Sequence, residues 1–101
     1  MLNNEVFTTI VDEQIERCRS LLVEKGKEYA LGKDRLKAFK QAAALQGCTS
    51  EEAVLGMLAK HIVSLSDMIT SHAVFGIDRW NEKITDSINY LLILRAVIEE
   101  G

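Results

Sequence analysis

The stretch Trp80–Glu99 constrains the fold of this chain more than any other. It begins as an amphipathic helical pattern, and from Ile88 to Ile98 it becomes apolar on nearly every side. A helix that is apolar all round has to be buried on all sides. We therefore expect this helix to pack against other helices of the same chain and against a further subunit.

Composition predicts an all-α fold in a single domain. The chain has 101 residues, which is the size of one domain. It is 48% hydrophobic, contains no proline and has only six glycines, a balance that favours long helices over a turn-rich β fold. We predict a four-helix bundle-like domain over residues 1–101, completed by oligomerisation.

Hydrophobic spacing and capping residues predict where the helices begin and end. Thr49 and Glu52 are three residues apart and match the capping box, the clearest helix start in the chain. The other expected caps are Asn3 or Asn4, Asp34 and Asp78, with Gly26 and Gly47 as helix ends. The expected helices cover Glu5–Lys25, Asp34–Gln46, Ser50–Ser71 and the stretch that follows Asp78.

Charge and targeting signals exclude several partners. The net charge is −3, and basic residues are mixed with acidic ones, so no basic stripe is available for extended nucleic acid. Cys18 and Cys48 lack the spacing of a zinc site or a disulfide framework. The N-terminus has no signal-peptide pattern, and no apolar run reaches about 18 residues. We expect a cytoplasmic protein that does not bind a membrane.

Polar side chains interrupt the third and fourth predicted helices in two stripes. Residues three and four positions apart share one side of a helix. A short connection predicts that these two helices pack antiparallel, so the middles of the stripes would meet. The first stripe consists of Lys60, His61, Ser64 and Asp67, and the second of Arg79, Glu82, Asp86 and Asn89.

Each polar feature has a structural interpretation beside the functional one. The stripes can form a ligand site, or they can be a satisfied polar layer that fixes helix register. His61 can be a catalytic base or a packed histidine. Tyr29 lies among lysines and arginines in the first connection, which can be an anion-binding flap or a solvated loop. The chain has no phosphate-binding loop, nucleophile elbow, paired CxxC or HExxH motif.

Four sequence runs carry a resemblance to a known family. They are KGKEYA, DRLKAFKQAA, GMLAKHIVSLSDMI and WNEKITDSINYLL, within Lys25–Leu94. In these runs the chain resembles small phage and prophage helical proteins of the nucleotide modification associated type. Those proteins are similar in turn to the MazG-like superfamily of all-α nucleoside triphosphate pyrophosphohydrolases.

The resemblance implies a bundle with an ExxE pair and an ExxD pair that hold magnesium on a nucleoside triphosphate. Placed on this chain, the first pair falls at His61 and Ser64, and the second at Lys83 and Asp86. Only Asp86 is acidic, so a magnesium site would need Glu82 or Asp67 as further ligands. Lys60 and a protonated His61 would instead meet a phosphate directly.

Three functions therefore stay open from the sequence. The first is a phage-type accessory protein that binds, and by binding sequesters, a nucleotide or nucleotide-derived molecule in the bacterial host cell. The expected ligand-binding residues are Lys60, His61, Ser64, Asp67, Glu82, Asp86, Asn89 and Tyr29. The second is a divergent pyrophosphohydrolase with Mg²⁺ on Asp86 and Glu82, and the third is a helical interaction module without catalysis. In each case we expect a homo-oligomer, a dimer or larger.

Overall fold

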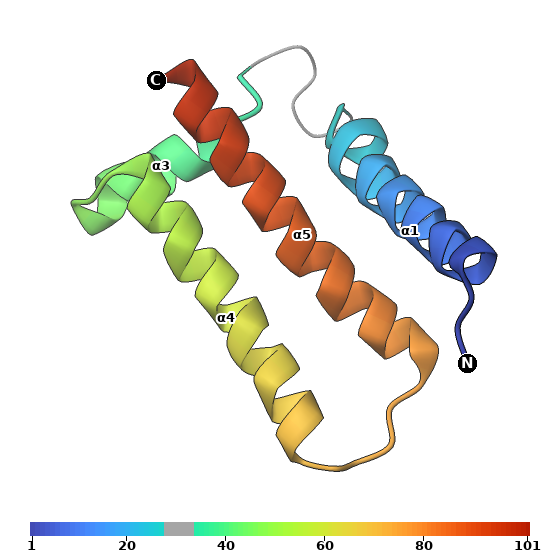
Figure 1. Ribbon diagram of the computed structural model, residues 1–101. Coiled ribbons are helices and arrows are strands. Elements are labelled where there is room, and N and C mark those ends of the chain that lie inside the picture. Colours follow the sequence, from blue (N-terminus) through green and yellow to red (C-terminus); the bar gives the residue numbers. More distant parts are fainter. Residues whose placement is uncertain (28–33) are drawn as a thin grey trace.

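The computed structural model describes residues 1–27 and 34–101, and in this part of the chain it is helical without a strand. The elements are α1 (Asn4–Arg19), the π-helical turn η1 (Ser20–Lys25), α3 (Lys37–Gln46), α4 (Ser50–Thr70) and α5 (Ile77–Glu100). The prediction of an all-α fold is confirmed. Figure 1 shows α4, α5 and α1 side by side, with α3 against the beginning of α4.

The helix caps agree with the sequence at three positions. The Val6 backbone N–H donates to Asn3 Oδ1 at 2.9 Å, and the capping box between Thr49 and Glu52 is complete in both directions. Gly47 has a left-handed φ of 66°, and beyond it Cys48 donates its N–H to the Ala43 carbonyl. These contacts satisfy backbone groups that a helix end leaves without partners.

Three predicted caps have other roles. Gly26 has a helical φ of −59°, so it does not form the left-handed turn expected of a helix-ending glycine; a side chain there would meet only the movable guanidinium of Arg35. Asp34 accepts the Leu36 N–H in a turn, and α3 begins only at Lys37. Gly76 is the N-cap of α5, and Asp78 lies in the first helical turn, where a carboxylate favours the positive end of the helix dipole.

The core is small and lies where α5 contacts α4 on one side and α1 on the other. Gln14 of α1 donates to Thr85 Oγ1 of α5 at 2.8 Å, and Cys18, one turn later, is buried. Few large side chains are buried along the remaining surface of α5. The buried apolar residues are Cys18, Ala43, Ala53, Val54, Leu58, Met68 and Val97.

Among the described residues, α4 has the length and composition of a helix that can cross a membrane, which the sequence analysis did not expect. These criteria alone are weak evidence, since core helices of water-soluble proteins also meet them. In this chain only 22% of the apolar window of α4 is buried. The helix therefore keeps an apolar surface that the chain itself does not cover.

Candidate functional site

His61 and Asp86 meet at the middle of the α4–α5 pair. Their closest atoms, His61 Nδ1 and Asp86 Oδ2, are 3.9 Å apart, and the two side chains are 23% and 33% exposed. This distance is too long for a hydrogen bond, but it gives an ion pair when the imidazole is protonated. The structure thus brings one residue of each predicted stripe together.

The other predicted site residues lie around this pair at different depths. Ser64 is half-buried, whereas Lys60, Asp67, Glu82 and Arg79 are exposed. None of these four charged side chains forms an ion pair with another described residue. Tyr29 and the proposed flap lie outside the described residues. These four charged side chains are therefore exposed to solvent and are not held by a partner in the described chain.

Asn89 is the polar residue of the second stripe that is most deeply buried. It is 8% exposed, and its Oδ1 has no hydrogen-bond partner within the described chain. A buried polar atom without a partner costs about 1–3 kcal/mol, so most proteins avoid this arrangement. Asn89 follows Asp86 by three residues, which places both on one side of α5. Because this Oδ1 exposes less than 1 Å², a ligand with a hydrogen-bond donor would reach it only after neighbouring side chains move.

Aromatic rings extend the cluster from α4 toward α3. The His61 ring stacks on Tyr90 with centroids 5.0 Å apart and an interplanar angle of 29°. Phe39 of α3 packs edge to face on Tyr90, with ring centroids 6.4 Å apart. The sequence did not connect Phe39 to the site. The position of Phe39 within its own helix could not predict the contact with Tyr90, because that contact depends on where α3 lies relative to α5.

Phe39 also lines a cavity of about 500 Å³ between η1, the beginning of α3 and α5. This volume lies within the range of small-molecule pockets. Ile93, one helical turn after Asn89, forms part of its wall from α5. The described lining residues are Leu21, Leu22, Gly26, Asp34, Arg35, Lys37, Ala38, Phe39, Gln41 and Ile93. Phe39 therefore links the cavity to the Tyr90–His61 pair, and neither Tyr90 nor His61 lines the cavity itself.

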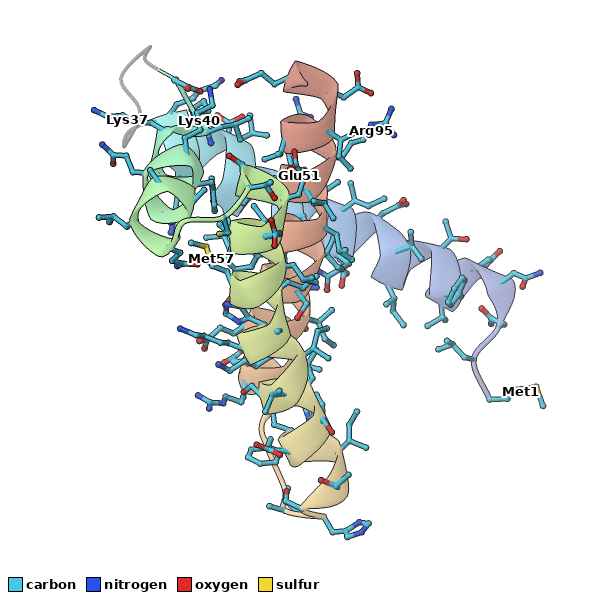
Figure 2. All side chains as sticks on the ribbon, turned by 90° about the vertical axis from the view of Figure 1, so that its left-hand side faces the viewer. Met1, Lys37, Lys40, Glu51, Met57 and Arg95 are labelled. Atoms are coloured by element: carbon cyan, nitrogen blue, oxygen red, sulfur yellow. The ribbon has the colours of Figure 1, made fainter. Side chains whose placement is uncertain are left out.

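Arg35 and Lys37 line this cavity, and both have N–H groups that can donate to a ligand. Arg35 donates from Nη2 to the Leu22 carbonyl at 2.6 Å, which anchors the guanidinium and leaves other N–H groups for a ligand. Lys37 forms no ion pair with a described residue, and Figure 2 shows it on the outer side of α3. An anchored guanidinium beside a lysine is suited to bind an anion such as phosphate.

Lys40 partly offsets the negative charge of Asp34 at this cavity, although the single lysine charge faces two carboxylates. Lys40 Nζ lies 2.6 Å from Asp34 Oδ2 and also contacts Glu100. The hydrogen bond from Lys40, helped by the Leu36 N–H, lowers the pKa of Asp34 below its ordinary value of 3.8. Asp34 and then Glu100 raise the pKa of Lys40 above 10.5. The bridge joins the beginning of α3 to the end of α5.

Lys40→Met should lower the melting temperature slightly near neutral pH, and this difference from wild type should shrink below pH 3.8. A lowered carboxyl pKa stabilises the fold above the unfolded-state value and loses its effect as Asp34 is protonated. The raised lysine pKa comes from the same ion pairs, so its contribution is present below pH 10.5 only while the carboxylates are ionised. Melting curves from pH 2.5 to 9 measure this dependence. Lys27→Met, which removes only a pair with Glu24 at 4.0 Å, is the control. A Lys40→Met difference that stays constant over this range would contradict the proposed bridge.

The carboxylates of the described residues do not gather into a magnesium site. No group of three or more His, Cys, Asp or Glu side chains suited to a metal occurs there. Glu82 lines a separate cavity of about 480 Å³ between α1 and α5, together with Glu16, Arg17 and Lys25. Because magnesium prefers several oxygen ligands, Asp86 and Glu82 would need further donors from a ligand.

Comparison with protein family models, curated proteins and solved structures found no match to this chain. The function therefore has to be argued from the site itself.

Proposed function

We propose that this protein binds a small anionic molecule with a planar ring, of the nucleotide type, along the side of the molecule that holds Phe39, Tyr90 and His61. The observation that carries the proposal is the continuity of this aromatic row with a cavity that has two cations. Phe39 contacts Tyr90 and also lines the cavity with Arg35 and Lys37. A nucleotide has the same succession of an aromatic base and a charged phosphate.

Each part of such a ligand has a chemical counterpart in the site. Phosphate oxygens would accept hydrogen bonds from Arg35 and Lys37. A base would pack against aromatic rings, and its edge would be recognised by the partly exposed carboxylate of Asp86 and, once neighbouring side chains move, by the buried amide of Asn89. Lys60, exposed next to His61, adds a positive charge at the other end of the row. We propose binding and not metal-dependent turnover, since the described residues hold no group of three or more metal-binding side chains around Asp86.

The proposal extends to the biological setting that the sequence resemblance implies. We propose a MazG-like bundle that has kept a nucleotide pocket without the metal-binding quartet. It would act as a homo-oligomer in the cytoplasm of a bacterial host, as a phage-type accessory protein that sequesters its ligand. The positions His61, Ser64 and Lys83 support this reading, because they carry no acid where the resemblance implies one.

A structural role for the same residues is the second candidate, and one contact favours it. His61 and Asp86 face each other and partly fill the polar layer between α4 and α5. In that case the layer fixes helix register and no ligand is required. The two candidates differ in whether nucleotides stabilise the fold.

Thermal melting with a panel of phosphates and nucleotides distinguishes them. The panel contains inorganic phosphate, nucleosides and the nucleoside mono-, di- and triphosphates. A ligand at ten times its Kd should add about 1.4 kcal/mol to the free energy of unfolding, and this raises Tm by several degrees. Lys37→Gln should weaken the response to phosphorylated ligands by about tenfold, the loss of roughly one charge-assisted contact.

Arg95→Gln provides the matched control. Arg95 lies on the other side of the molecule, paired with Glu99 at 2.7 Å, as Figure 2 shows relative to Lys37. Its loss should leave the ligand response unchanged. A Tm that no member of the panel shifts would favour the structural role and exclude the binding proposal.

A further inference from the structure

A second surface lies on the α4–α5 pair, and it consists of exposed aliphatic side chains in two rows. Within each row the residues are seven positions apart, the spacing that keeps side chains on one side of a helix that packs against others. The members are exposed by between 37% and 63%. We call this surface the apolar face; it consists of Leu55, Ile62 and Ile69 on α4 and Ile84, Leu91 and Ile98 on α5.

Helix geometry places both rows on the same side of the pair. From Leu58, which is buried toward α5, a turn of 100° per residue puts Ile62 on one flank of α4 and Met57 on the other. On α5, which runs antiparallel to α4, the same rotation puts Leu91 on the flank of Ile62. Asp86 and Asn89 lie on the opposite flank, so the candidate ligand site and the apolar face point away from each other.

The first half of α1 extends this surface outward. The hydrogen bond from Gln14 to Thr85 and the buried Cys18 hold the later part of α1, whereas all of residues 4–13 are exposed. Figure 2 shows that the free end of α1, marked by Met1, projects from one side of the α4–α5 pair, whereas α3 and Met57 lie on the other. We call residues 4–13 the α1 arm; its exposed apolar residues are Val6, Phe7, Ile10 and Val11.

The size of the exposed surface argues for a large partner. The chain exposes 7459 Å², whereas a compact monomer of 11.3 kDa exposes about 5,700 Å². The excess of about 1,700 Å² per chain corresponds to an interface of about 3,400 Å² between two copies, within the range of obligate homodimers. The radius of gyration, 15.6 Å, likewise exceeds the value of about 13 Å for a compact domain of this length.

We infer that a second copy of this chain covers the apolar face. Two helix pairs with seven-residue rows pack as a four-helix bundle, and a two-fold axis lets the same face of both copies meet and close the assembly. The α1 arm of each copy then lies along the α4–α5 pair of the other. A lipid surface is a poorer occupant, because the chain is acidic and Glu51 and Glu52 begin α4, whereas cell membranes carry anionic lipids.

The oligomeric state of the purified full chain tests this inference. Light scattering after size exclusion should give twice the 11.3 kDa mass of one chain, and Tm should rise with protein concentration. Leu91→Glu should weaken the dimer by about 100-fold or more, since it places a charge in an apolar interface. Phe7→Asp should weaken it as well and leave the α4–α5 pair intact. Val63→Glu changes an exposed residue of α4 outside the apolar face and should keep the dimer.

Two results would overturn the inference. The first is a folded wild-type monomer with a Tm independent of concentration. The second is a Leu91→Glu variant that stays dimeric. If Leu91→Glu unfolds, a wild-type Tm that depends on concentration still supports a dimer, and Phe7→Asp then locates the interface. A wild-type monomer that floats with phosphatidylcholine–phosphatidylglycerol vesicles would assign the face to lipid and not to a second copy. Each outcome is independent of nucleotide binding, because the ligand site lies on the opposite flank.

Discussion

Replacing Asn89 by leucine should stabilise the ligand-free protein and weaken its response to nucleotides at the same time. Asn89 is buried, and its Oδ1 has no partner in the described chain. Leucine has the same side-chain branching and number of heavy atoms as asparagine, forms helix more readily and has no polar atom to satisfy. We expect the free energy of unfolding to rise by about 1–2 kcal/mol, measured by urea denaturation. The nucleotide-dependent shift in Tm should fall in the same variant, since the amide that recognises the ligand is gone.

Asn81→Leu is the matched control for this experiment. It makes the same substitution in the same helix at a partly exposed position, so it reports the gain in helix propensity alone, about 0.5 kcal/mol. Asn89→Leu should raise the free energy of unfolding by more than Asn81→Leu does. A destabilised Asn89→Leu with an unchanged ligand response would show that the amide is satisfied in solution and serves the fold.

A gain in stability together with a loss of ligand binding is expected where a residue serves binding at the expense of the fold. A protein that keeps an unpartnered amide at 8% exposure loses stability relative to an apolar core. Nothing in local helix formation requires asparagine at this position, because Asn is a poorer helix former than leucine. Where a residue breaks the local rules of folding, a function at that position is the expected compensation.

The helices could be predicted from the sequence because their signals are local. Thr49 and Glu52 are three residues apart, and their reciprocal hydrogen bonds need nothing from the rest of the chain. Asp34 shows where this reasoning fails. Its carboxylate accepts the Leu36 N–H through Oδ1 and binds Lys40 through Oδ2. Lys40 in turn contacts Glu100, sixty residues further on. In the structure α3 begins at Lys37, after the turn in which Asp34 accepts the Leu36 N–H.

The candidate site divides in the same way. Spacing within each helix was sufficient to place His61 and Asp86 on the stripes that meet, because antiparallel packing follows from a short connection. Spacing did not reveal that Phe39 joins these residues to a cavity, since the edge-to-face contact with Tyr90 depends on where α3 lies. The sequence also predicted that the last helix has more apolar residues than one chain can bury. It did not predict on which flank of the helix these residues are exposed.

Leu58→Ala should cause the largest loss of stability among single truncations on α4. Leu58 is 8% exposed on the side of α4 that faces α5, between the polar cluster at His61 and the capped end of the helix. Truncation of a buried leucine costs about 2–5 kcal/mol through lost burial and the cavity left behind. Because small domains have only about 5–15 kcal/mol of stability, urea denaturation at fixed protein concentration should show a strongly shifted midpoint.

Leu45→Ala is the matched control, because it makes the same Leu-to-Ala change at a position without buried packing. Leu45 is 89% exposed in α3, so its truncation removes few contacts and should change the free energy of unfolding by about 0.5 kcal/mol or less. The comparison also tests the assignment of the two flanks of α4. If Leu58→Ala costs no more than Leu45→Ala, α4 does not pack on α5 through Leu58. The apolar face would then be the true core contact, and both the ligand site and the dimer surface would have to be reassigned.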